Sequence, residues 1–194
     1  MASAVTAISN LFSEETHLGI LDYFDNHLWK VTPSNKENQC GRFTWNDLSL
    51  FEKPHNQLVD LVSEIFEEPV VPTYTCTSLY HDGIGTLPPH VDRDQCRYTV
   101  SYMIRCSDLE NWPIYVSDYE LSGKEWEDLV ESGDGLARTL DEIKMSTNSN
   151  KWIKIDHHPN SAAFFSGTRR WHYREKITAG SAETVLFHYE PLHP

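Results

Sequence analysis

The stretch TLPPHVDRDQCRYTVSYMI, residues 86–104, sets a histidine and an aspartate two positions apart, just before a run rich in β-branched and aromatic residues. That run predicts a β-strand. Successive residues of an extended chain point to opposite faces, so His90 and Asp92 project to one side while Val91 points away. An imidazole and a carboxylate are therefore aimed at one point.

Short strand-like runs extend from this stretch in both directions, separated by turns rich in Gly, Pro, Ser and Asn. They are VVPTYTCTSLY (70–80), RYTVSYMIRC (97–106), WPIYV (112–116), KWIKIDH (151–157), SAAFFSG (161–167), RRWHYREKI (169–177) and AETVLFHYE (182–190). So many short strands predict a mainly β fold, as a barrel or a jelly roll.

Two amphipathic helices are predicted before the strands, over 13–30 and 55–68, because apolar residues recur there at helical spacing. We expect a single domain over 1–194, in which 1–69 give helical support and 70–194 form the β core. An acidic segment at about 118–150 interrupts the strands and is expected to be an insertion at one mouth of the barrel. This segment either contacts the substrate, as long loops inside compact domains often do, or is a solvent-exposed insertion without a function of its own.

Charge and composition exclude several classes of partner. The chain has 194 residues, and 29 acidic against 16 basic residues give a net charge of −13, which argues against nucleic-acid or anionic-membrane binding. No run is long enough to span a membrane and no signal peptide is recognisable, so a cytoplasmic protein is expected. Four scattered cysteines without a C-x-x-C pair are expected to be reduced thiols.

A third ligand is expected far along the chain. A non-haem iron site uses two imidazoles and one carboxylate on one face of the metal. His172, which follows the Gly-containing turn of FFSGTRRWH, supplies the second imidazole in this hypothesis, 172 − 90 = 82 residues after His90. The competing histidines are His188 in the last strand and the pair His157 and His158, which we expect to face solvent beside a Pro-Asn turn.

The chain from about 71 to 191 resembles the Fe(II)- and 2-oxoglutarate-dependent dioxygenases, in particular their prolyl-4-hydroxylase-like branch. The resemblance rests on the tyrosine of SLYHDGIG, the His-x-Asp of PHVDRD, the strand RYTVSYMI and the histidine delivered by AAFFSGTRRWH. It implies a cupin-like double-stranded β-helix with helices packed outside one sheet. It also implies Fe(II) held by His90, Asp92 and His172 as the catalytic triad, with 2-oxoglutarate and O2 as cosubstrates.

The resemblance further implies a basic residue for the distal carboxylate of 2-oxoglutarate, which an Arg fork binds well. Much of the family places this base roughly ten residues after the distal histidine, where this chain has TAGSAETV and no base. The substitutes are Arg174, two residues after His172, then Arg105 and finally Arg97. Strand alternation and the family pattern add the remaining cosubstrate-site candidates, which are Tyr80, Thr99, Ser101 and Met103.

These expectations give a dioxygenase that hydroxylates a small-molecule or amino-acid-like substrate and releases succinate and CO2. A protein or peptidyl hydroxylase of the same family is the nearest alternative. Because this chain lacks the basic residue that much of the family has roughly ten positions after the distal histidine, two other functions stay open. They are an Fe(II) oxidase that does not use 2-oxoglutarate and a non-catalytic cupin-like metal-binding module. The sequence specifies neither the substrate nor the oligomeric state.

Overall fold

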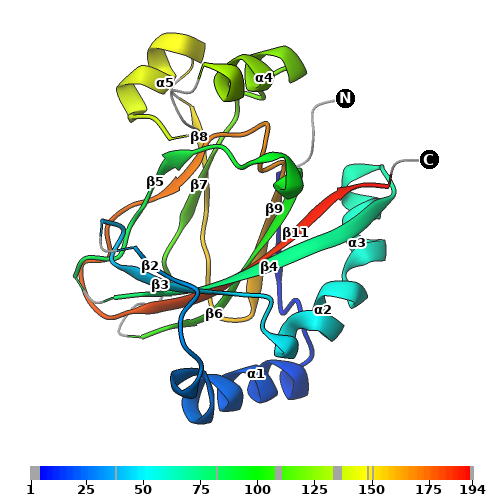
Figure 1. Cartoon of the computed structure of the whole chain (residues 1–194), viewed down its shortest axis with the longest axis vertical. Helices are drawn as coiled ribbons and strands as arrows, with labels where there is room; N and C mark the ends of the chain where they lie inside the picture. Colours follow the sequence, from blue (N-terminus) through cyan, green and yellow to red (C-terminus); the bar gives the residue numbers. More distant parts are fainter. Residues whose placement is uncertain are drawn as a thin grey trace.

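Eight antiparallel strands are divided between two sheets, and the chain passes back and forth between these sheets to form a flattened barrel (Figure 1). The computed structural model describes residues 5–192 except 38, 82, 108–110, 133–136, 148 and 150. The larger sheet contains β4 (Val70–Tyr80), β6 (Tyr98–Cys106), β9 (Ser161–Phe165) and β11 (Ala182–Pro191). The smaller sheet has the order β5 (Leu87–His90), β10 (His172–Arg174), β7 (Ile114–Ser117) and β8 (Trp152–Ile155). This winding is the double-stranded β-helix, and the predicted fold class is confirmed.

Three further strands widen the larger sheet, and the sequence analysis did not predict them. β1 (Thr6–Ser9) pairs with β9 at one edge, and β3 (Arg42–Asn46) pairs with β4 at the other, followed by β2 (Asn35–Glu37). β1 and β2 have only four and three residues and no clear alternation, and β3, which does alternate polar and apolar residues, has only five.

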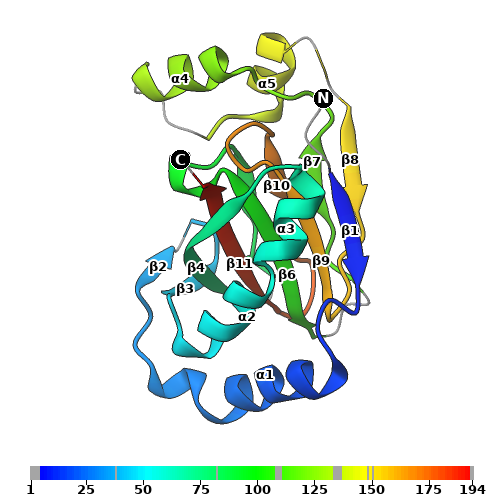
Figure 2. The same cartoon turned by 90° about the vertical axis from the view of Figure 1, so that its right-hand side faces the viewer.

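Helices cover the outer face of the larger sheet (Figure 2). α1 (Glu14–Asn26) begins where the Ser13 hydroxyl accepts a hydrogen bond from the Thr16 amide, which satisfies one of the free N–H groups of a helix start. The predicted second helix is split at Leu58 into α2 (Glu52–Gln57) and α3 (Val59–Phe66). The main apolar core lies between helices and sheet and includes Ile20, Phe24, Phe51, Val62, Val100, Tyr102, Ile104, Phe164 and Phe187.

The predicted insertion forms two helices at the end of the barrel opposite α1 (Figures 1 and 2). α4 (Gly123–Glu131) begins with a capping box between Ser122 and Glu125, and α5 (Leu140–Thr147) follows. Beneath them a small apolar cluster joins the insertion to the smaller sheet and its loops through Val91, Leu121, Ile143 and Trp171. The insertion is therefore packed onto the barrel. Within the described ranges, no helix is long and apolar enough to cross a membrane.

Candidate metal site

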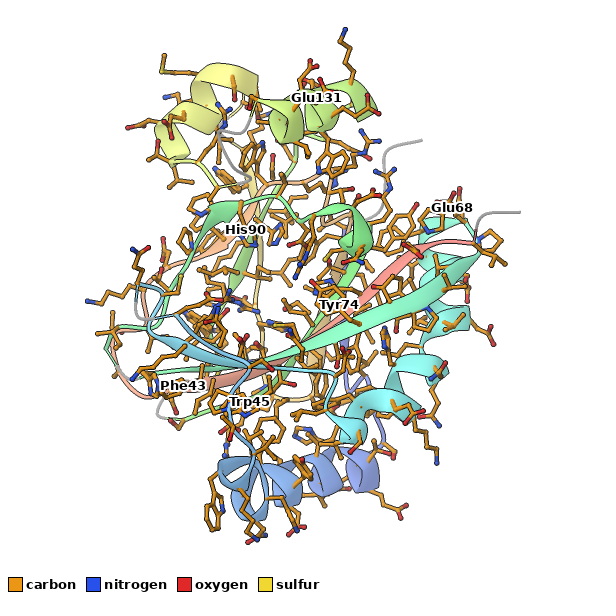
Figure 3. The ribbon with its side chains drawn as sticks, viewed as in Figure 1. Phe43, Trp45, Glu68, Tyr74, His90 and Glu131 are labelled. Carbon is orange, nitrogen blue, oxygen red and sulfur yellow. The ribbon has the colours of Figure 1, made fainter. Side chains whose placement is uncertain are left out.

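Two neighbouring strands of the smaller sheet bring the three predicted ligands together. β5 and β10 pair so that His90 lies opposite His172, and their ring centroids are 4.2 Å apart. Asp92 follows two residues after His90, and its Oδ1 lies 3.6 Å from His90 Nε2 and 3.7 Å from His172 Nε2. A ligand atom from each of the three lies within 4.8 Å of the other two. In Figure 3, His90 lies between the insertion helices and the strands β2 and β3.

Hydrogen bonds at Nδ1 turn the Nε2 atom of each histidine toward Asp92. His90 Nδ1 lies 2.9 Å from the carbonyl of Pro88, and His172 Nδ1 lies 3.0 Å from the carbonyl of Arg170. A carbonyl only accepts, so each Nδ1 carries the proton and each Nε2 keeps its lone pair. Burial, followed by the neighbouring His90, lowers the pKa of His172 to about 4, so this ring is neutral at physiological pH.

The carboxylate of Asp92 is held in one orientation. Burial alone would raise the pKa of Asp92, but the interactions with His172 first and then with His90 outweigh it and keep the pKa below its usual range. Thr99 Oγ1 donates to Asp92 Oδ2 at 3.0 Å, which leaves Oδ1 for the histidines. Two neutral imidazoles and one ionised carboxylate oxygen on one side of a point are the donor set that non-haem Fe(II) sites use, so the residues fit this metal.

Gly167 lies directly against this carboxylate, and the sequence analysis noted it only as part of a turn. A Cβ at position 167 would lie 2.2 Å from Asp92 Oδ2 and 2.6 Å from Thr99 Oγ1. The Gly167 carbonyl also accepts a hydrogen bond from the Asp92 amide at 2.8 Å. Any larger side chain here would push the carboxylate away, because real Cβ atoms do not approach other atoms so closely.

A second group of potential ligands, formed by Asp92, Cys96 and His188, does not suit a metal as well. The Thr99 hydroxyl lies between Asp92 and His188, at 3.2 Å from His188 Nδ1. Burial and then the charge of Asp92 raise the pKa of Cys96 to about 12, whereas a metal binds the thiolate form. His188 thus supports the site from behind the carboxylate.

Arg174 is buried on the inner side of the barrel, and β6 connects it to the candidate ligands. Its guanidinium donates to the Trp112 carbonyl at 2.5 Å, to Ser101 Oγ at 3.1 Å and to His157 Nδ1 at 2.6 Å. These acceptors are all neutral, and no carboxylate in the described part of the chain forms an ion pair with Arg174. Burial lowers the pKa of Arg174 to about 10, so it stays protonated at neutral pH.

Three other residues that were predicted for the cosubstrate site lie one after another along the inner face of β6. Thr99 contacts Asp92, Ser101 contacts Arg174, and Met103 packs in an apolar cluster with Tyr80 and Trp112. Two residues of an extended strand span roughly 7 Å. The candidate ligand Asp92 and the buried cation Arg174 therefore contact neighbouring inward positions of one strand.

Tyr80 is buried in the same apolar cluster and its phenol oxygen accepts a hydrogen bond from Arg42 at 3.0 Å. Arg42 comes from β3 and also binds Glu37 at 2.6 Å. Arg42 was not among the predicted site residues, because the β3 strand that carries it was not predicted.

Arg105 lies away from the other candidates. It binds Glu183 through two nitrogens, at 2.8 and 2.9 Å, and Asp25 of α1 at 2.7 Å. The pairing of β6 with β11 shifts between Glu183 and Thr184, so Ile104 is an extra residue in the strand. A bulge of this kind reverses the alternation beyond it, and Arg105 reaches the helix-covered side.

Two of the remaining expectations are also resolved. Arg97 donates to Thr168 Oγ1 at 3.1 Å, within the turn that precedes His172. The expectation that His157 faces solvent was wrong, since its side chain is fully buried and accepts the hydrogen bond from Arg174. Burial, together with the charge of Arg174, lowers the pKa of His157 well below its usual value, which keeps Nδ1 available as an acceptor.

Comparison with known proteins supports the fold at low sequence identity. No protein-family profile matches the chain, and no curated protein sequence matches it. Among solved structures, the carbocyclase SnoK from nogalamycin biosynthesis, described as non-heme and alpha-ketoglutarate dependent, is similar with a TM-score of 0.74 at 11% identity, over 96% of this chain and 80% of SnoK.

Two further structures show the range of that fold. HygX from Streptomyces hygroscopicus, solved with nickel and 2-oxoglutarate bound, gives a TM-score of 0.64 at 10% identity, over 98% of this chain and 84% of HygX. A prolyl hydroxylase from Trichoplax adhaerens, in complex with a hypoxia-inducible-factor peptide, gives 0.66 at 14% identity, over 97% of this chain and 84% of that chain. The architecture of this chain is thus that of the 2-oxoglutarate-dependent oxygenases.

Proposed function

We propose that this chain is an Fe(II)- and 2-oxoglutarate-dependent oxygenase that works as one catalytic domain. The observation that carries the proposal is the convergence of His90 Nε2, His172 Nε2 and Asp92 Oδ1, each with its other polar atoms already hydrogen-bonded. The likeness to HygX, which was solved with a metal and 2-oxoglutarate, supports the same cofactors here. The bound iron would supply the activation of O2, coupled to oxidation of 2-oxoglutarate to succinate and CO2.

Arg174 is the proposed partner of the distal carboxylate of 2-oxoglutarate. A buried guanidinium bound only to neutral acceptors is stabilised by an anion, and Arg binds a carboxylate through two parallel hydrogen bonds. Ser101 and His157 hold the guanidinium in place. In this proposal the base lies on β10, two residues after His172, and not on the last strand, where much of the family carries it.

We propose a small-molecule substrate and hydroxylation as the outcome. HygX has been solved with hygromycin B, and SnoN and SnoK are an epimerase and a carbocyclase of nogalamycin biosynthesis, which supports a small-molecule substrate. The peptide-bound prolyl hydroxylase supports the alternative of a peptide substrate. Succinate release measured with panels of small molecules and of peptides would separate the two.

The cosubstrate assignment is tested by adding Fe(II) and then 2-oxoglutarate to the protein without oxygen. We expect the weak visible charge-transfer band that chelation of iron by a 2-oxo acid produces. His172→Ala should abolish the band, whereas Arg174→Gln should keep it but require much more 2-oxoglutarate. Arg105→Gln is the matched control, because Arg105 binds Glu183 and Asp25 outside the site. Iron binding without a band would overturn the 2-oxoglutarate assignment and favour an Fe(II) oxidase or a metal-binding module.

A further inference from the structure

The insertion contacts the very loop that carries two of the proposed metal ligands. Trp126 of α4 donates from its indole Nε1 to the backbone carbonyl of Asp92 at 3.1 Å. The amide of Arg138 donates to the carbonyl of Pro89 at 3.0 Å, and Ala137 pairs with His90 in an isolated antiparallel bridge. Both ends of the short His-x-Asp segment are therefore bonded to the insertion.

The Trp126 indole binds a polar atom of Asp92 that the barrel leaves free. Its amide donates to Gly167, its Oδ2 accepts from Thr99, and its carbonyl accepts from Trp126. Oδ1 is the atom that faces the two histidines. The barrel thus holds Asp92 through the amide and Oδ2, and the insertion holds it through the carbonyl.

Apolar packing supports the same contact. Val91, between the two ligands, is 1% exposed and packs on the opposite side, with Leu121 and Ile143 of the insertion and with Trp171. Trp126 lies partly buried against this cluster. The loop is therefore enclosed, with ligand side chains toward the barrel and Val91 toward the insertion.

We propose that Trp126 is a positioning residue for Asp92, and that the α4–α5 insertion completes the metal site. The inference rests on the metal site of the proposed function. An outer hydrogen bond to a ligating side chain typically changes metal affinity by about 10–100-fold, and the Trp126 bond acts on the backbone of such a residue. Coupling between two sites is reciprocal, so metal binding must also stabilise the docked insertion.

The first test compares Ni(II) affinity, by calorimetry without oxygen, between the wild type and Trp126→Phe. Phenylalanine keeps an aromatic ring in the cluster but removes the N–H donor, so we expect Ni(II) to bind about 10–100-fold more weakly. Trp152→Phe is the matched control, because Trp152 packs against the same cluster and edge-on to Tyr173. Equal losses in both variants, or none in Trp126→Phe, would overturn the proposal.

The second test uses the wild type alone and so does not depend on the folding of a variant. Hydrogen exchange with and without Ni(II) should show slower exchange in α4 on metal binding, with α1 unchanged as the internal reference. If Ni(II) binds and α4 exchanges at the same rate, the coupling is absent and the inference is wrong. If the wild type binds no metal at all, the proposed function itself fails, which distinguishes the two failures.

Discussion

Thr99 and Asp92 share a hydrogen bond of 3.0 Å that decides which carboxylate oxygen faces the metal position. Thr99 has a single hydroxyl proton, and an ionised carboxylate only accepts, so the proton goes to Asp92 Oδ2. His188 Nδ1, 3.2 Å from the same hydroxyl, must then be the donor to Thr99. Burial lowers the pKa of His188 to about 4, so the ring is neutral with its proton on Nδ1.

Thr99→Val should therefore weaken metal binding while keeping the fold. Valine has nearly the shape of threonine but no hydroxyl, so Asp92 Oδ2 loses its donor and the carboxylate can rotate. We expect Ni(II) affinity to fall about 10–100-fold, as for other outer hydrogen bonds of metal ligands. Thr99→Ser keeps the hydroxyl and should retain most of the affinity. A Thr99→Ser variant as weak as Thr99→Val would show that packing, and not the hydrogen bond, is responsible.

Gly167→Ala should damage the metal site by steric pressure. The new Cβ would lie 2.2 Å from Asp92 Oδ2 and 2.5 Å from the Cys96 carbonyl. Overpacking of this kind typically costs about 1–3 kcal/mol, which corresponds to a decrease in Tm of roughly 2–12 °C for a chain of this size. Gly19→Ala is the control, because nothing lies within 4 Å of its added Cβ and alanine favours a helix. Thermal unfolding and Ni(II) titration measure both effects, and unchanged metal binding in Gly167→Ala would contradict the prediction.

Ser101→Ala and Arg174→Gln should separate the charge of the arginine from its orientation. Removing Ser101 Oγ takes away one neutral acceptor, at 3.1 Å, and leaves the charge in place. A hydrogen bond of this type contributes about 1 kcal/mol, so 2-oxoglutarate affinity should fall only about 5-fold. Arg174→Gln removes a charged, two-pronged contact, and a loss of about 100-fold or more is expected. Equal effects of the two variants on a 2-oxoglutarate titration would argue against Arg174 as the anion partner.

The metal-free protein should lose stability as the pH falls from about 7 toward 4. Burial holds the pKa of His172 and His188 at about 4 and lowers that of His157 well below its usual value. Between the ordinary histidine pKa of about 6.5 and these values, the unfolded chain binds more protons than the folded one. The free energy of unfolding therefore decreases with falling pH, by up to about 1.4 kcal/mol per unit for each such histidine. Chemical denaturation at several pH values measures this slope, and a flat profile would contradict it.

Local patterns were enough to predict the barrel and to select three candidate ligands that the fold brings together. The strands could be predicted because β-branched and aromatic runs alternate with turn residues. His90 and Asp92 could be predicted as a pair because they share a face at the start of a strand. The bulge at Ile104 could not be predicted, and it is the reason that Arg105 leaves the face shared by Thr99, Ser101 and Met103. Alternation is a local rule, whereas a bulge depends on how two distant strands pair.

The contacts that support the ligands come from elements far apart in the chain. Gly167 meets Asp92 across 75 positions (167 − 92 = 75), and Trp126 reaches the Asp92 carbonyl from the insertion. The sequence by itself predicted most strands of the barrel and His90, Asp92 and His172 as candidate ligands, because strand runs follow from residue type and short-range spacing and the three donors lie in motifs that a known family shares. Only the tertiary structure decided that Arg174 is buried with no carboxylate partner among the described residues, and that Trp126 touches the loop of the candidate ligands His90 and Asp92. Such contacts depend on strand register and packing, which no short stretch of the sequence specifies.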